Sequence, residues 1–175
     1  VGDHGFSAQR NMLPAHLGWF APLPWDAPQQ EPTMTDDIEY LCGKALAADS
    51  SFSMMQVDPA RMATSPGLPR IAAVCKKYET LRRAGCVPES IRARLGSPGD
   101  EFTLSQVGVD RWAFRPVTYD RHTTRGLADE ADTWTAQNAF GRQGARLRIE
   151  ALMAVGGYDA PGAVMLSDFG DGASM

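Results

Sequence analysis

Hydrophobic residues recur at helical spacing just after the first thirty residues of the chain. The i, i+3, i+4, i+7, i+8 pattern predicts one apolar helical stripe, and its members are Ile38, Leu41, Cys42, Ala45 and Leu46. Thr35 offers a hydroxyl cap, and the acidic residues Asp36, Asp37 and Glu39 place negative charge at the positive end of the helix dipole. The pattern therefore predicts an amphipathic helix that organises the rest of the chain.

Two short apolar runs flank this helix. The run from Phe52 to Val57 predicts a buried strand, because the polar residues 49–51 interrupt the helical stripe before it. The run from Leu17 to Phe20 predicts a short strand ahead of the helix, and the proline-rich stretch from Pro22 to Pro32 predicts a loop between the two. Strand, helix and strand in this order are typical of a parallel α/β fold.

Further helical patterns follow a predicted loop over residues 58–69. A second amphipathic helix is predicted to end at Gly85, and its stripe consists of Ile71, Val74, Cys75, Tyr78 and Leu81. A short helical turn over residues 88–95 precedes the break from Gly96 to Asp100. Glycine and proline in this break favour a boundary between two structural regions.

Beyond the break the hydrophobic period changes from helical to alternating. Strands are predicted over residues 101–104, 112–119, 133–137, 145–152 and 163–169, and residues 146–150 alternate polar and apolar side chains. Short strands separated by turn-forming residues suggest an antiparallel sandwich. The region from residue 101 to residue 175 is small for a complete sandwich, so we expect its continuation to be missing.

Composition narrows the possible functions. A net charge of -4 and a pI near 5.3 argue against a general nucleic-acid binder. No apolar run approaches the roughly 18 to 20 residues of a membrane span, and no leader of the signal-peptide type begins the sequence. Because the chain starts at Val1 and ends close to a predicted strand, we interpret it as a fragment of a longer protein.

Motifs for cofactors and metals are not found in the sequence. The three cysteines have no zinc-ligand spacing, and no dinucleotide-binding, Walker or serine-hydrolase motif occurs. Asp168 and Asp171 can help to hold calcium, but turn chemistry explains them more simply. We therefore predict neither a cofactor nor a metal site.

Three motifs stand out along the chain, namely Pro-Thr-Met-Thr-Asp-Asp-Ile-Glu-Tyr at 32–40, Lys-Tyr-Glu-Thr-Leu-Arg at 77–82 and Gly-Asp-Glu-Phe at 99–102. Together with the order of the predicted elements, they resemble the end of the (β/α)-barrel in large bacterial glycoside-hydrolase-like proteins that act on polysaccharides. The resemblance implies that residues 1–95 end a (β/α)8-type barrel, that residues 96–100 form a linker and that residues 101–175 begin an antiparallel β-sandwich. It also implies a secreted or periplasmic protein with polysaccharide as its partner.

Candidate binding residues lie in the segments that a parallel fold places at the carboxyl ends of its strands. Trp19 and Trp25 can stack on a sugar ring, although Trp19 can equally belong to the core. Asp26 and Glu31 can hydrogen-bond sugar hydroxyls, and loop acids are also commonly just solvated. His4 and His16 can bind substrate, and His4 can instead pair with its neighbouring aspartate.

Catalytic residues remain unassigned. Glycosidases use two carboxylates about 5 to 10 Å apart, and in the barrels that this chain resembles these acids lie on middle strands, which would precede Val1. The leading hypothesis is therefore a fragment of a secreted glycoside hydrolase that is inactive alone. The alternatives are a non-catalytic carbohydrate-binding protein and a structural or assembly domain.

Overall fold

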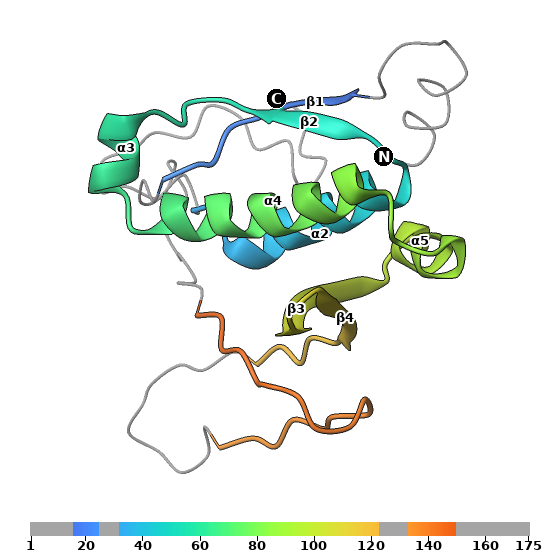
Figure 1. The fold of residues 1–175 in the computed structure, drawn as a ribbon. Helices are drawn as coiled ribbons and strands as arrows, with labels where there is room; N and C mark the ends of the chain where they lie inside the picture. Colours follow the sequence, from blue (N-terminus) through green and yellow to red (C-terminus); the bar gives the residue numbers. More distant parts are fainter. Residues whose placement is uncertain (1–15, 25–31, 123–132, 150–175) are drawn as a thin grey trace, which may run out of the picture.

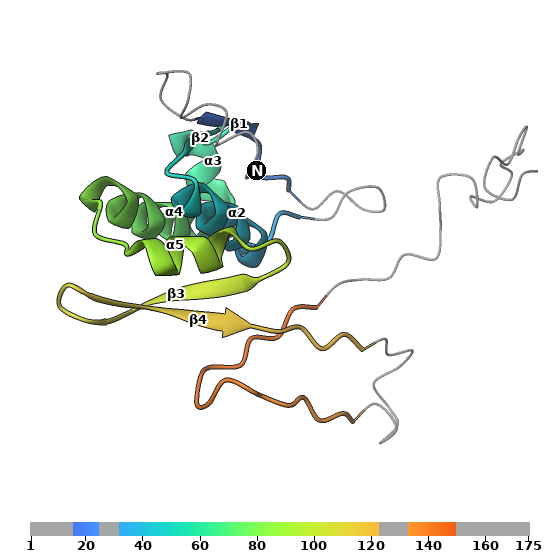
Figure 2. The same cartoon turned by 90° about the vertical axis from the view of Figure 1, so that its right-hand side faces the viewer.

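The computed structural model describes residues 16–24, 32–122 and 133–149. The elements are β1 (His16–Phe20), α2 (Thr35–Ala47), β2 (Ser51–Met54), α3 (Pro59–Thr64), α4 (Gly67–Ala84), α5 (Glu89–Gly96), β3 (Glu101–Gly108) and β4 (Arg111–Val117). Figure 1 shows three layers, with the β1–β2 pair on one side of helices α2 and α4 and the β3–β4 pair on the other. The view from a right angle in Figure 2 shows the same order.

The first part of the chain forms a strand–helix–strand unit. β1 and β2 pair in parallel, as the sequence predicted, and α2 connects them. Phe20 and Phe52 meet edge to face with their ring centroids 5.8 Å apart. β2 ends at Met54 rather than Val57, because Gln56 adopts a φ of 58°, which is incompatible with an extended strand.

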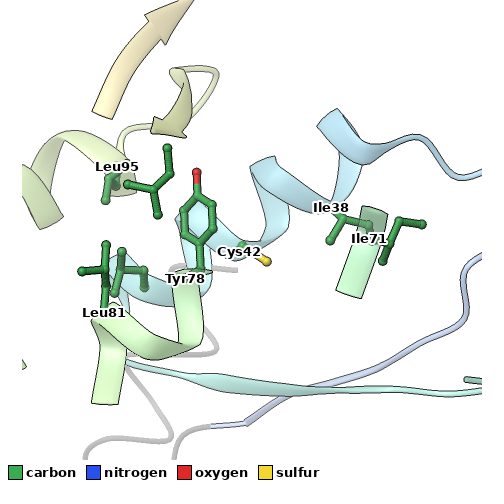
Figure 3. Packing of buried hydrophobic residues seen from close by; sticks show 8 residues of the cluster. Ile38, Cys42, Ile71, Tyr78, Leu81 and Leu95 are labelled. Atoms are coloured by element: carbon green, nitrogen blue, oxygen red, sulfur yellow. The ribbon is translucent and has the colours of Figure 1, made fainter. Parts of the chain in front are cut away.

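Helices α2 and α4 supply most of the buried side chains. The core cluster combines α2, α4, α5 and β3, and its buried residues are Ile38, Cys42, Leu46, Ile71, Tyr78, Leu81, Leu95 and Leu104 (Figure 3). Both predicted helical stripes are thus confirmed in position. α4 ends at Gly85, which has a left-handed φ of 61° that glycine adopts without strain.

Two local predictions in this part are wrong. Thr35 is the first residue of α2 and not its cap; instead, the Asp37 carboxylate accepts a hydrogen bond of 2.9 Å from the Met34 backbone N–H. The predicted loop over residues 58–69 contains α3. This short helix begins because the Asp58 side chain accepts from the Arg61 N–H at 2.9 Å and Pro59 already has a helical φ.

The β3–β4 hairpin packs on the helices. It is antiparallel, Asp110 takes a φ of 54° in its turn, and Leu104 is buried in the same core as Ile38 and Tyr78. The ring centroids of Phe114 and Tyr78 lie 6.1 Å apart. The hairpin therefore shares one apolar core with the helices, while the domain division at residues 96–100 stays a prediction.

The predicted fold class, a barrel end followed by a β-sandwich, is wrong. In the described residues the strands form two separate two-stranded sheets, with no closed barrel. The predicted strand at 133–137 is also absent from that part of the chain, and so is the described part, 145–149, of the strand predicted at 145–152. The strand predicted at 163–169 lies outside the described residues. The alternation at 146–149 has another cause, since Arg146 and Arg148 reach acidic side chains of α2.

Candidate functional site

The carboxyl end of the β1–β2 pair is the candidate site. In a parallel α/β arrangement, ligands bind beyond the carboxyl ends of the strands. β1 is irregular here, because His16 pairs with Ser51 and Trp19 with Ser53, so that β1 holds one residue more than β2 between the two pairs. This extra residue forms a β-bulge, a feature that changes the direction in which the following side chain points.

The His16 side chain fixes the bulge. Its Nδ1 accepts a hydrogen bond of 3.0 Å from the Gly18 backbone N–H. Nδ1 is therefore unprotonated, and Nε2 carries the hydrogen that it donates to the Ser53 hydroxyl, also at 3.0 Å. Gly18 has a φ of 111°, which a residue with a Cβ adopts only under strain. One imidazole thus joins the bulge of β1 to β2.

Trp19 follows this bulge and is 72% exposed. Three other large apolar side chains lie exposed just beyond the two strands, namely Leu23, Met55 and Val57. Monomeric proteins leave single apolar residues exposed without consequence, but several at one end of a sheet are typical of a binding surface. The interpretation of Trp19 as a core residue is therefore not supported.

The backbone around these side chains is hydrogen-bonded. The Met55 N–H donates to the Phe20 carbonyl at 2.9 Å, which extends the strand pairing by one residue. Thr33 closes the base of the loop after β1, because its hydroxyl accepts from the Leu23 N–H at 2.8 Å and its own N–H donates to the Leu23 carbonyl at 3.0 Å. Trp19 is thus presented from a constrained framework.

The other predicted site residues are not placed. His4, Trp25, Asp26 and Glu31 lie outside the described residues, so their roles stay predictions. Of the predicted set, the structure places Trp19. It also shows a structural role for His16, which sequence reasoning had considered only as a possible substrate ligand.

The acidic cluster at the start of α2 has structural partners. Arg148 Nη1 lies 2.7 Å from an Asp36 carboxylate oxygen and 3.0 Å from one of Asp37. The position of these acids in the first turn of α2 is consistent with the predicted interaction with the helix dipole. The ion pairs with Arg148 provide a second stabilising interaction.

Glu39 is the centre of a buried polar cluster that sequence reasoning missed. One carboxylate oxygen accepts from the Leu104 N–H at 2.8 Å and from the Tyr78 hydroxyl at 3.4 Å. The other accepts from the Thr103 hydroxyl and from Arg146 Nη1, both at 2.9 Å. Burial and the neighbouring Glu39 carboxylate raise the pKa of Tyr78. A carboxylate engaged by four donors is suited to holding elements together rather than to proton transfer.

Within the described ranges, no group of three or more His, Cys, Asp or Glu side chains is placed to hold a metal ion. The same part of the chain contains no helix that is long and apolar enough to cross a membrane. Comparisons with protein-family models, with curated proteins and with solved structures find no match for this chain. Function is therefore inferred from the geometry at β1 and β2.

Proposed function

We propose that this chain is a carbohydrate-binding part of a carbohydrate-active protein, with Trp19 as its stacking platform. The observation that carries the proposal is the 72% exposure of Trp19 directly after the His16–Gly18 bulge. The apolar face of a pyranose ring matches a flat indole, and the indole N–H can donate to a sugar hydroxyl. A surface fixed before the ligand arrives loses little conformational entropy on binding.

Binding is supported better than hydrolysis by the described residues. Asp36 and Asp37 hold Arg148, and Glu39 is buried under four donors. None of these three acids is placed as a glycosidase acid or nucleophile, since each already binds structural partners. If the whole protein is a secreted glycoside hydrolase, its catalytic pair comes from residues other than these three.

Affinity electrophoresis in gels that contain soluble polysaccharides tests the proposal. We expect the chain to be retarded in at least one gel, and Trp19→Ala to weaken the binding by about tenfold, equivalent to ~1.4 kcal/mol. Trp134→Ala is the matched control. Trp134 is also partly exposed, but it stacks on His122 with a centroid distance of 4.8 Å, far along the chain from β1.

Two results would contradict the proposal. The first is a chain that migrates equally in all gels with and without polysaccharide. The second is equal loss of retardation in Trp19→Ala and Trp134→Ala, which would indicate weak contact with any exposed tryptophan. Circular dichroism of each variant shows whether it has kept the fold.

A second candidate function is assembly with another polypeptide. In the described residues β1 and β2 pair only with each other, whereas parallel strands normally belong to larger sheets that are covered on both faces. Neither strand contains Lys, Arg, Asp or Glu, the charges that commonly protect a free edge. A chain that self-associates in sedimentation experiments and shows no glycan retardation would favour this function.

A further inference from the structure

A cavity lies between α2, β2 and α4, and its lining residues do not include Trp19 or Gly18. Its volume is about 360 Å³, and Phe52 and Met54 of β2 contribute to its apolar wall. Two cysteines line it, Cys42 from α2 and Cys75 from α4. Cys42 is 2% exposed in the core (Figure 3), whereas Cys75 is only partly buried. Both residues therefore line the cavity, and Cys75 is the more exposed of the two.

The two thiols interact directly and differ in acidity. Their mutual hydrogen bond, followed by burial, raises the pKa of Cys42. The same hydrogen bond lowers the pKa of Cys75, although burial opposes this change. A thiolate is the nucleophile in disulfide exchange, and Cys75 is the more exposed of the two cysteines that line the cavity. Cys75 is therefore the sulfur that reacts first.

We propose that Cys42 and Cys75 form a thiol-exchange site that small disulfides enter through this cavity. The Cys75 thiolate attacks one sulfur of the small disulfide R–S–S–R, the S–S bond breaks, and RS⁻ leaves and takes up a proton. Cys42 then loses its proton to solvent and attacks the Cys75 sulfur, which releases the second RS⁻. The products are a Cys42–Cys75 disulfide and two RSH molecules, so two protein thiols are oxidised and one small disulfide is reduced.

The position of the site gives the reaction a structural consequence. α2 and α4 form the central layer of the fold, and β2 and α3 lie between the two cysteines in the chain (Figure 1). A covalent link between the helices would restrict the unfolded chain and so stabilise the fold. This inference does not depend on carbohydrate binding.

The experiment uses the full chain with Cys86→Ser, because Cys86 is exposed and can form links between molecules. The protein is incubated with 2-hydroxyethyl disulfide, a small neutral reagent, and then alkylated without reduction. We expect intact-mass spectrometry to show the loss of two hydrogens, no alkylation and no retained reagent. Peptide mapping should link Cys42 to Cys75, and the oxidised protein should unfold at a higher urea concentration than the reduced protein.

Two variants separate the roles of the thiols. Cys42→Ser should retain the reagent at Cys75 as a stable mixed disulfide, and Cys75→Ser should react at least tenfold more slowly. The proposal is overturned if the parent protein keeps the reagent as a mixed disulfide, if both cysteines remain alkylatable, or if Cys42 and Cys75 react at equal rates. The first two of these results are measured on the parent protein, so the proposal can be overturned even if a variant does not fold.

Discussion

Replacement of Glu39 by alanine tests the polar cluster that joins α2 to the hairpin. The residue is 5% exposed, and its carboxylate accepts hydrogen bonds from α4, β3 and the segment after residue 133. Glu39→Ala leaves the Leu104 N–H without its acceptor at a residue that is 2% exposed. The variant therefore loses hydrogen bonds and leaves a buried donor unsatisfied.

The free energy of unfolding should fall by about 3 kcal/mol. An unsatisfied buried donor costs roughly 1 to 3 kcal/mol, and a lost hydrogen bond to a charged group costs a similar amount. The Arg146 contact adds little, because the Arg146 side chain is 63% exposed and water replaces its partner. Arg146→Ala should therefore cost less than about 1 kcal/mol. Glu39→Gln keeps one acceptor oxygen for the Leu104 N–H and should be intermediate.

Urea unfolding followed by circular dichroism measures these differences. Arg146→Ala serves as the control, since it removes the exposed partner and leaves the buried carboxylate with its three other donors. The reasoning is refuted if Glu39→Ala unfolds within about 0.5 kcal/mol of the parent, which is the range of ordinary surface substitutions. It is also refuted if Arg146→Ala is as destabilising as Glu39→Ala.

Two further predictions concern other charged groups. Lys44→Met should lower the free energy of unfolding by about 2 kcal/mol in urea, because the buried Lys44 Nζ donates to three carbonyls at the end of α5 and before β3; an unchanged value would contradict this. Hydrogen bonds from Arg82, and then from Arg83 against opposing burial, lower the Glu79 pKa from 4.5 to about 2. The ionised Glu79 carboxylate therefore stabilises the fold above pH 4.5, and this contribution is lost as the pH falls towards about 2. Glu79→Gln should remove this acid-dependent loss, which amounts to no more than about 1 kcal/mol because the Glu79 side chain is 37% exposed. Identical profiles of unfolding free energy against pH for the variant and the parent would contradict the assignment.

The parts of the fold that sequence predicted correctly depend on local periodicity. Ile38, Cys42 and Leu46 form a stripe that any partner layer would bury, so α2 followed from spacing alone. Gly85 could be assigned as the end of α4 because glycine adopts the left-handed conformation that ends a helix. The sequence Asp58–Pro59 is a helix-start signal that indicates α3 within the predicted loop.

The parts that failed depend on tertiary partners. Arg146 and Arg148 alternate with apolar residues as in a strand, but their spacing serves ion pairs with α2. Glu39 lies three residues before Cys42, on the edge of the apolar stripe, which was a signal that it is buried. The donors that make this burial tolerable come from distant segments and could not be identified from the sequence.

The candidate site was only partly predictable. A short strand that contains Trp19 and ends at Phe20 followed from the apolar run, and so did its place before a loop. The bulge did not, because it requires the His16 ring to contact both the Gly18 backbone and Ser53 of another strand. A histidine two residues before a glycine is too common a pattern to indicate this arrangement.

The most direct test of the account is a titration of a protein with Trp19 as its single tryptophan. The chain has four tryptophans, and the other three are replaced by phenylalanine; circular dichroism confirms the fold. With a polysaccharide that retards the parent chain, we predict a saturable blue shift of the Trp19 emission, because a bound sugar ring excludes water from the indole. Retardation of this protein by the polysaccharide with no change in Trp19 emission would contradict the proposed site.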